Sequence, residues 1–127
     1  MDNQITVSAS LRFKEQIREA IASLGTIGIK AVFPNLDSGV KKEDVDVTFM
    51  QKLERKHFES ISQSRALYVI CPDGYVGTLV SVEVGYAKAK GLKIIFSEEP
   101  EDLGLQALAD RYIAMDELQQ LTQILDA

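Results

Sequence analysis

One acidic residue, Glu83, lies in an otherwise apolar stretch and is the first candidate for chemistry. It sits between two short apolar runs, ALYVIC and LKIIF, in a segment with helical periodicity. At about 100° per residue, its helical face carries mostly apolar side chains, namely Val76, Leu79, Val80, Tyr86 and Ala87. An unpaired buried charge is costly, so this carboxylate either reaches a partner or has a raised pKa. Glu83 is therefore a reactive group or, alternatively, a rim residue that pairs with Lys90.

The chain has one histidine, His57, and one cysteine, Cys71. This is too few of the usual ligands for a zinc site, and we expect no metal and no cofactor. Cys71 ends an apolar run, where a buried thiol is common, and the lone cysteine favours a reducing, cytoplasmic setting. His57 can serve as a general acid near neutral pH, although a histidine on an inward helix face is more often a core residue.

The elements that must position the candidate carboxylate form a strand, a loop, a helix and a strand over residues 66–96. The apolar runs are typical of buried parallel strands. Pro72, Gly74 and Gly77 mark the loop, and Gly91 ends the helix. This order is a βαβ unit, whose crossover is almost always right-handed.

The rest of the chain alternates strands and helices in the same way. We expect further strands over residues 5–9, 28–33 and 112–113, and helices over residues 11–24, 44–63, 102–109 and 115–125. In the second of these helices the inward stripe is expected to be Val47, Met50, Leu53, His57, Phe58 and Ile61. This alternation predicts a doubly wound α/β fold, with a parallel sheet of about five strands and helices on both faces.

In such sheets, ligands bind outside the carboxyl ends of the strands, at the point where the strand order reverses. Three predicted loops meet this criterion, over residues 8–12, 33–38 and 72–77. The sequence thus predicts a site built from these loops and from the helix that carries Glu83.

Size and charge narrow the class of partner. The 127 residues predict one domain, residues 1–127, and the formal net charge is -5 without a run of basic residues. Duplex nucleic acid and anionic membranes are therefore not expected as partners, and no apolar run approaches the length of a membrane span. A small anionic ligand remains compatible, because one site needs only local donors.

The segment GYVGTLVSVEVGYAKAKGLKII resembles the signature helix of the nucleoside 2-deoxyribosyltransferase-like family, whose members carry a Glu-x-Gly-x-Ala element. Here that element begins at Glu83 and ends at Ala87. FESISQSRALYVI and SASLRF are similar to the family's helix-to-strand entry and first loop, so the resemblance covers most of residues 4–97. It implies a doubly wound α/β fold and cleavage or transfer at the N-glycosidic bond of deoxynucleosides or their 5′-monophosphates.

The resemblance implies a role for several residues. Glu83 corresponds to the nucleophile that attacks the anomeric carbon. In the first loop, which begins at Ser8, Ser10 and Arg12 correspond to residues that hold the 5′-phosphate; alternatively, Ser10 only caps the helix and Arg12 is solvated. Ser81 resembles a further phosphate contact, or is an ordinary exposed helix serine.

Two positions depart from the family pattern. His57 stands 26 residues before Glu83, where family enzymes usually carry an aspartate that protonates or orients the base. Gly77 stands six residues before Glu83, where the transferase branch tends to have an aspartate. Asp73 can substitute or simply form a turn, and Tyr75 can stack on a base or ribose or simply pack the loop.

Two hypotheses of function follow. The first is an enzyme that cleaves or transfers at an N-glycosidic bond through Glu83. The second is a non-catalytic module of the same fold that binds or senses a nucleotide, which the altered position at His57 favours. A third alternative, an α/β domain that only binds other proteins, would not explain why Glu83 stands on an apolar helix face. Because family members associate, we also expect a homodimer or higher homo-oligomer.

Overall fold

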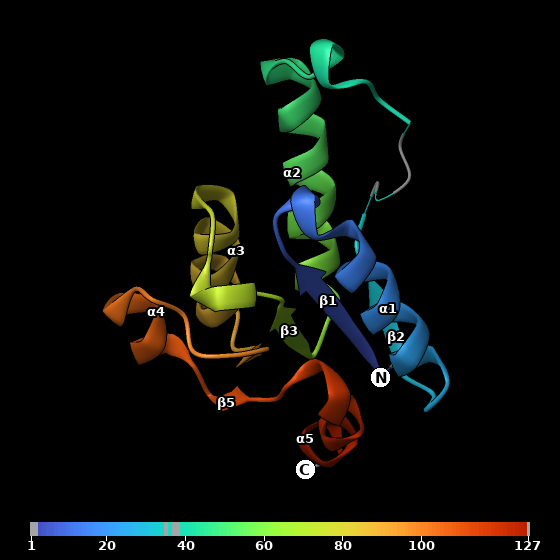
Figure 1. Cartoon of the computed structure of the whole chain (residues 1–127), viewed down its shortest axis with the longest axis vertical. Coiled ribbons are helices and arrows are strands. Elements are labelled where there is room, and N and C mark those ends of the chain that lie inside the picture. The colour runs from blue at the N-terminus through green and yellow to red at the C-terminus, as the bar shows by residue number, and fades with distance from the viewer. Residues whose placement is uncertain (1–2, 35, 37–38, 127) are drawn as a thin grey trace.

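A five-stranded parallel sheet forms the centre of the protein in the computed structural model, which describes residues 3–34, 36 and 39–126 (Figure 1). Its strands are β1 (Gln4–Ser8), β2 (Lys30–Val32), β3 (Ala66–Val69), β4 (Lys93–Phe96) and β5 (Arg111–Tyr112), in the order β2-β1-β3-β4-β5. Every neighbouring pair is parallel. The doubly wound α/β fold predicted from the sequence is confirmed. Three residues of the predicted loop over 33–38, Asn35, Asp37 and Ser38, lie outside the described residues.

Helices connect the strands and cover both faces of the sheet. The α-helices are α1 (Lys14–Gly25), α2 (Val47–Ser62), α3 (Thr78–Ala89), α4 (Leu103–Leu108) and α5 (Leu121–Leu125). Short 3-10 helices occupy Leu11–Phe13, Lys42–Asp44, Pro72–Gly74 and Met115–Gln120. The single closing helix expected over residues 115–125 is wrong in its first half. That half is a 3-10 helix in which the backbone at Glu117 departs from helical geometry, with φ -126°.

Two separate cores lie on the two faces of the sheet. On one face α1 and the C-terminal helices pack against side chains of alternate strand positions, including Ile5, Val7, Tyr68 and Ile95. On the other face α2, α3 and α4 cover the intervening positions, including Leu67, Val69, Ile94 and Phe96. This partition follows from the two-residue period of a strand, which sends successive side chains to opposite faces.

The same alternation aims the polar residues of β1 at α2. Ile5 and Val7 enter the core under α1, so Thr6 and Ser8 face the opposite way. The Thr6 hydroxyl lies 2.7 Å from the Ser60 hydroxyl and 2.8 Å from that of Ser64. The last residue of β1, Ser8, is therefore directed towards α2 and α3 at the carboxyl edge of the sheet.

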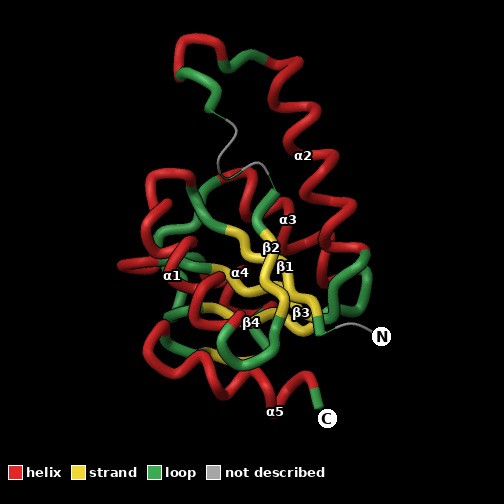
Figure 2. The backbone as a smooth tube through the Cα atoms, turned by 90° about the vertical axis from the view of Figure 1, so that its right-hand side faces the viewer, coloured by secondary structure: helices red, strands yellow, loops and turns green. Residues whose placement is uncertain are grey.

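The N-terminal part of α2 projects beyond the sheet (Figure 2). A helix of 16 residues spans about 24 Å, and the strands it crosses have at most five residues. The inward stripe predicted for this helix is therefore wrong at Val47, whose side chain is 75% exposed. It is correct at Leu53, His57 and Ile61, which are buried. Within the described residues, no helix is long and apolar enough to cross a membrane.

Candidate active site

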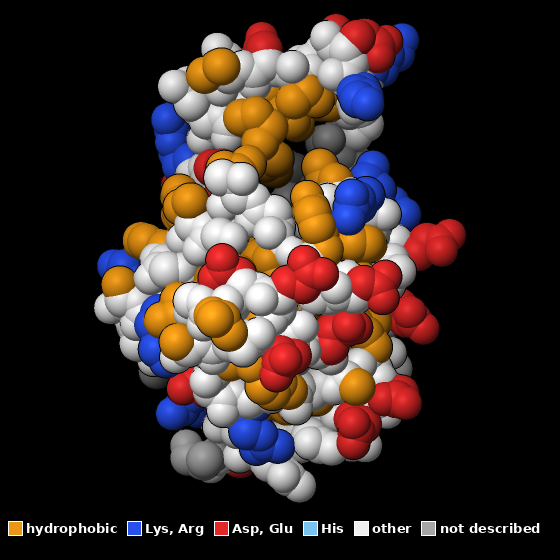
Figure 3. Space-filling view, turned by 60° about the vertical axis from the view of Figure 1, so that its left-hand side comes forward, with side chains coloured by type: hydrophobic (Ala, Val, Ile, Leu, Met, Phe, Trp, Pro, Cys, Tyr) orange, Lys and Arg blue, Asp and Glu red, His pale blue; other side chains and the backbone are white. Residues whose placement is uncertain are grey.

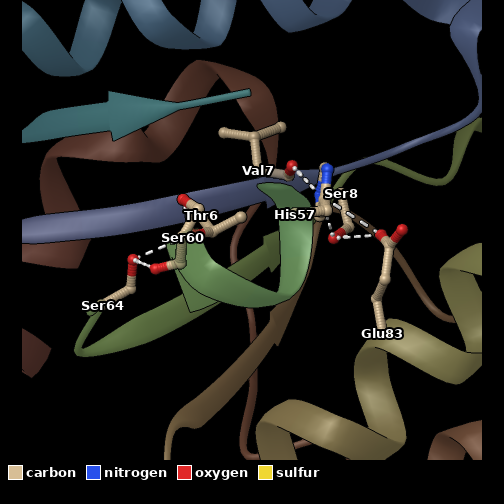
Figure 4. A network of polar contacts seen from close by, with 7 residues as sticks. All are labelled: Thr6, Val7, Ser8, His57, Ser60, Ser64 and Glu83. Carbon is tan, nitrogen blue, oxygen red and sulfur yellow. Dashed lines mark hydrogen bonds and ion pairs between the residues drawn. The ribbon is translucent and has the colours of Figure 1, made fainter. Parts of the chain in front are cut away.

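Ser8, His57 and Glu83 meet at the carboxyl edge of the sheet (Figure 4). The Ser8 hydroxyl donates a hydrogen bond of 2.8 Å to Oε1 of Glu83. Nε2 of His57 lies 3.3 Å from the same carboxylate oxygen and 3.3 Å from Oγ of Ser8. These residues come from β1, α2 and α3, so the fold alone assembles the group.

The strand order explains why these residues converge. β1 and β3 are neighbours in the sheet, but their connections lead to opposite faces, so the chain diverges between their carboxyl ends. Glu83 lies in the second turn of α3, whose Val80, Val84 and Ala87 are buried. It is itself only 3% exposed, so the alternative of a rim residue paired with Lys90 is wrong. Nζ of Lys90 lies 5.6 Å from the centre of the Tyr86 ring instead.

The surroundings of His57 define its protonation. Nε2 lies 3.2 Å from the carbonyl oxygen of Val7, which can only accept a hydrogen bond. The proton of Ser8 is directed at Glu83, so Nε2 must carry a proton of its own. Burial lowers the pKa of His57 to about 4, and the bond to the Val7 carbonyl opposes this only in part. At neutral pH the imidazole is therefore uncharged, and its Nε2, 3.3 Å from Oε1 of Glu83, does not form an ion pair with the carboxyl group.

Glu83 is held in an environment that disfavours its charge. Burial raises its pKa, and the neighbouring carboxyl group of Glu54 raises it further, through a hydrogen bond and through like charge. The hydrogen bond from Ser8 acts in the opposite direction and lowers the pKa. Burial and Glu54 thus favour the neutral form of Glu83, whereas the hydrogen bond from Ser8 favours its ionised form.

Glu54 is a site residue that sequence reasoning missed. It lies on α2 three residues before His57, which places both side chains on one side of the helix. The signal was available in that spacing, but Glu54 stands in the charged run LERK and resembles part of a solvated face.

A cavity of about 300 Å³ adjoins Glu83. Its walls combine the polar residues Ser10, Glu54, His57 and Glu83 with apolar or aromatic ones, including Phe33, Met50, Leu53, Tyr75 and Leu79. Phe33 packs edge-on against the His57 ring, with 5.1 Å between ring centres. On the face in Figure 3, hydrophobic side chains gather around a hollow in the upper half of the molecule. A cavity of this size and lining suits a small organic ligand.

The first loop contributes to the mouth of the cavity. Ser10 lines it and also caps the short helix that follows, accepting a hydrogen bond from the backbone N–H of Arg12. The guanidinium carbon of Arg12 lies 3.9 Å from the centre of the Tyr75 ring. Arg12 is thus exposed but not simply solvated, because it stacks on the loop that leads to α3.

The remaining predicted residues divide into two groups. Gly77 and Tyr75 line the cavity, and Gly77 is the N-cap residue immediately before α3. Asp73 is an exposed turn residue with φ 58°, and it does not line the cavity. The hydroxyl of Ser81 donates to the carbonyl oxygen of Gly77 at 2.9 Å, which occupies it within its own helix. Among the described residues, no three His, Cys, Asp or Glu side chains are grouped as a metal site.

Comparison with known proteins identifies solved structures that share the fold. No protein-family model matches the chain, and no curated protein matches it. A 2-deoxyribosyltransferase from Bacillus psychrosaccharolyticus matches with a TM-score of 0.74 and 14% identity, over 93% of this chain and 89% of its own. The CMP N-glycosidase of Clostridium botulinum matches with a TM-score of 0.60 and 19% identity, over 95% and 98%.

A third structure, a conserved protein from Enterococcus faecalis, matches with a TM-score of 0.63 and 16% identity, over 95% of this chain and 99% of its own. At these identities the likeness establishes the fold. The chain has the fold of the nucleoside 2-deoxyribosyltransferase-like proteins, as the resemblance of its sequence implied.

Proposed function

We propose that the protein is an enzyme that cleaves the N-glycosidic bond of a nucleoside or nucleoside 5′-monophosphate, or transfers its 2-deoxyribosyl group, with Glu83 as the nucleophile. The observation that carries this proposal is a buried carboxyl group on the wall of a cavity, contacted by the Ser8 hydroxyl and the His57 imidazole. Burial of this kind is otherwise costly, and reactive carboxyl groups are commonly held this way.

The proposed reaction begins with attack of Glu83 on the anomeric carbon of the sugar. The bond between that carbon and the base nitrogen breaks, and the base leaves with its electron pair. The sugar is left as an ester of Glu83, which water or a second base then cleaves. His57 suits a residue that positions the site better than a general acid, because at a pKa of about 4 the ring lacks, near neutral pH, the second proton that a general acid releases.

The walls of the cavity support a nucleoside as the ligand. Phe33, Leu53 and Leu79 offer apolar surface for a flat base, and Tyr75 offers a ring for stacking. Two proteins that share the fold are, by their descriptions, a 2-deoxyribosyltransferase and a CMP N-glycosidase. Both names describe chemistry at the bond between a sugar and a base, which supports the same class of reaction for this chain.

We assign the 5′-phosphate of a nucleotide ligand to the mouth of the cavity. Arg12 is held there by its stack on Tyr75, with Ser10 close by. The 12-residue helix α3 begins at Thr78, and its N-cap residue Gly77 provides no side-chain cap, so its first backbone N–H groups are open to an anion. Ser81 and Asp73 are weaker candidates, since one is bonded to Gly77 and the other lies outside the cavity lining.

The second candidate is a module that binds or senses a nucleotide without turnover. The raised pKa of Glu83 favours it, because a protonated carboxyl group is a poor nucleophile. In that case the cavity, Ser10 and Arg12 would retain ligand binding while chemistry is lost.

One experiment separates the two candidates. The protein is incubated with ribo- and deoxynucleosides and their 5′-monophosphates, free base is measured by chromatography, and melting temperature is recorded with the same compounds. An enzyme releases base from at least one compound, and Glu83→Gln abolishes that release. Thermal shifts without base release would establish the binding module, because a ligand that binds the native state stabilises it.

We expect a homodimer or higher homo-oligomer in a cytoplasmic setting. Val47, at the start of α2, and Val45, just before it, are exposed apolar residues next to the cavity wall at Met50. A second copy that covered this region would bury them. Sedimentation at several protein concentrations tests this, and a monomer at all of them would contradict it.

A further inference from the structure

Arg12 lies over the ring of Tyr75 at the mouth of the cavity. The guanidinium carbon is 3.9 Å from the centre of this ring and 5.1 Å from the centre of the Phe13 ring. The two rings meet edge to face, with 6.2 Å between their centres. Arg12 is therefore held by aromatic side chains from two loops, one that follows β1 and one that follows β3.

The loop that carries Tyr75 has a well-defined backbone. The backbone N–H of Tyr75 donates to the carbonyl oxygen of Pro72 at 3.2 Å, and that of Glu101 donates to the carbonyl oxygen of Gly74 at 3.0 Å. Gly74 has φ 78°, and a Cβ atom there would lie 3.0 Å from the carbonyl oxygen of Glu99, so this turn requires glycine. Tyr75 thus presents its ring from a fixed position.

The stack leaves the donors of Arg12 available to a ligand. A guanidinium that lies on a ring uses its flat face, whereas its five N–H groups point outward in its own plane. Within the part of the chain that the structure describes, no carboxylate forms an ion pair with Arg12. The chain carries a formal net charge of -5, so carboxylates are abundant elsewhere. A held guanidinium without a carboxylate partner is suited to an anionic ligand.

We propose that Tyr75 is a positioning residue for the 5′-phosphate, because its ring holds Arg12 in the orientation in which the guanidinium binds the phosphate. This inference rests on the proposed function and gives Tyr75 a role beyond the cavity wall. An arginine that is ordered before the ligand arrives loses less side-chain entropy on binding, so the stack strengthens phosphate binding without touching the phosphate.

Titration with inorganic phosphate tests this role without a nucleobase. The protein is labelled with nitrogen-15, the Nε–H signal of Arg12 is assigned by its loss in Arg12→Lys, and its shift is followed as phosphate is added at constant ionic strength. We expect Tyr75→Leu to raise the Kd for phosphate about threefold or more, and Tyr75→Phe, which keeps the ring, to stay within about twofold of wild type. Tyr75 is 40% exposed, so neither change disturbs the core.

The control for this titration is Tyr112→Leu. Tyr112 is a similarly exposed tyrosine on β5 that does not line the cavity, so its replacement should leave the Kd for phosphate unchanged. An equal Kd in Tyr75→Leu and wild type would overturn the proposal. A wild-type Arg12 signal that does not respond to phosphate would overturn it as well.

Kinetics with a 5′-monophosphate and its parent nucleoside test the same role in the proposed reaction. We expect Tyr75→Leu to raise KM for the monophosphate about threefold or more relative to the nucleoside, while kcat changes less than about twofold. Tyr75→Phe should restore both values. In the Arg12→Ala background, Tyr75→Leu should have no further selective effect, because the group that it positions is gone. Equal losses on both substrates would show that the ring serves the base or the fold, and would overturn the proposal.

The two experiments separate a failure of this inference from a failure of the proposed function. If no compound releases its base, the proposed reaction is refuted, and the phosphate titration still decides whether Tyr75 positions Arg12. If base is released and Tyr75→Leu leaves the discrimination between monophosphate and nucleoside unchanged, the proposed reaction stands and the role of Tyr75 is refuted.

Discussion

Ser8, the last residue of the first strand, donates a hydrogen bond of 2.8 Å to Glu83, which lies 75 residues later in the second turn of α3. Both side chains are buried. The bond joins the two connections that diverge at the carboxyl ends of β1 and β3. It also supplies the interaction that lowers the pKa of Glu83 against the burial and the neighbouring carboxyl group that raise it. Ser8, at the end of β1, thus favours the ionised form of the candidate nucleophile Glu83 through this hydrogen bond.

Replacing Ser8 tests this relationship. Ser8→Ala removes a donor to a carboxylate, which is worth about 1.5 to 3 kcal/mol, so we expect kcat/KM to fall by roughly tenfold to 100-fold. The pKa of Glu83 rises when the donor is lost, so the acidic limb of the pH–rate profile moves to higher pH. Ser62→Ala, an exposed change on α2, should alter neither quantity. A lower rate with an unshifted pH profile would argue against an effect through Glu83.

His57 makes the stability of the fold depend on pH. Its pKa falls from 6.5 to about 4 in the folded state, so the unfolded chain binds a proton more readily. The stabilisation from the neutral form is complete above pH 6.5 and is lost as the pH falls to about 4. Over that window we expect a loss of roughly 3 kcal/mol of unfolding free energy.

The measurement for His57 compares wild type with His57→Gln by urea denaturation between pH 4 and pH 8. Glu83 changes the unfolding free energy with pH in the opposite direction to His57. The stability that comes from its raised pKa is present at low pH and is lost as the pH rises through that pKa. Because Nε2 of His57 lies 3.3 Å from the Glu83 carboxyl group, the same pair is also compared in the Glu83→Gln background, where the difference isolates His57. A difference that does not change with pH would contradict a neutral, buried imidazole.

Arg12 should distinguish nucleotides from nucleosides. If its guanidinium holds the 5′-phosphate, Arg12→Ala removes a charged contact and should raise KM for a 5′-monophosphate about tenfold or more. KM for the matching nucleoside should change less than about twofold, apart from the lost stack on Tyr75. Lys14→Ala removes the same charge two residues later, from an exposed position, and serves as the control. Equal weakening of both substrates would refute the phosphate assignment.

Thr6 should matter for stability and not for chemistry. Its hydroxyl lies between those of Ser60 and Ser64 in a buried network that joins β1 to α2. Thr6→Val keeps the shape and leaves two buried hydroxyls with one partner fewer, so we expect a loss of about 1 to 3 kcal/mol. Thr26→Val, at an exposed turn, should cost much less. Chemical denaturation measures both, and equal effects would show that the network adds no stability.

Local patterns were sufficient to predict the fold. Apolar runs, the glycines at helix ends and the alternation of strands and helices predicted a parallel sheet of about five strands, which the structure confirms; the strand order comes from the structure alone. The prediction failed at Val47 and at the closing helix. Both depend on where a helix ends relative to the sheet beneath it, which periodicity does not record.

The site was predicted in part. Glu83 stands out because a charged residue on an apolar helix face is locally anomalous, and the structure brings it together with Ser8 and His57. Glu54 gave no such signal, because its neighbours in the sequence are charged and only the packing of α2 turns it towards the cavity. The stack of Arg12 on Tyr75 joins two loops that are distant in the sequence, so the sequence of neither loop predicts it.

The central claim is that Glu83 bonds covalently to the sugar, and mass spectrometry of a reaction stopped in acid tests it most directly. With a substrate that releases its base, we predict a protein species heavier by one sugar residue, located on the peptide that contains Glu83. The adduct should be missing from Glu83→Gln and present in Glu59→Gln, an exposed change on α2. Base release from the wild-type protein without an adduct, together with undiminished release by Glu83→Gln, would contradict the account.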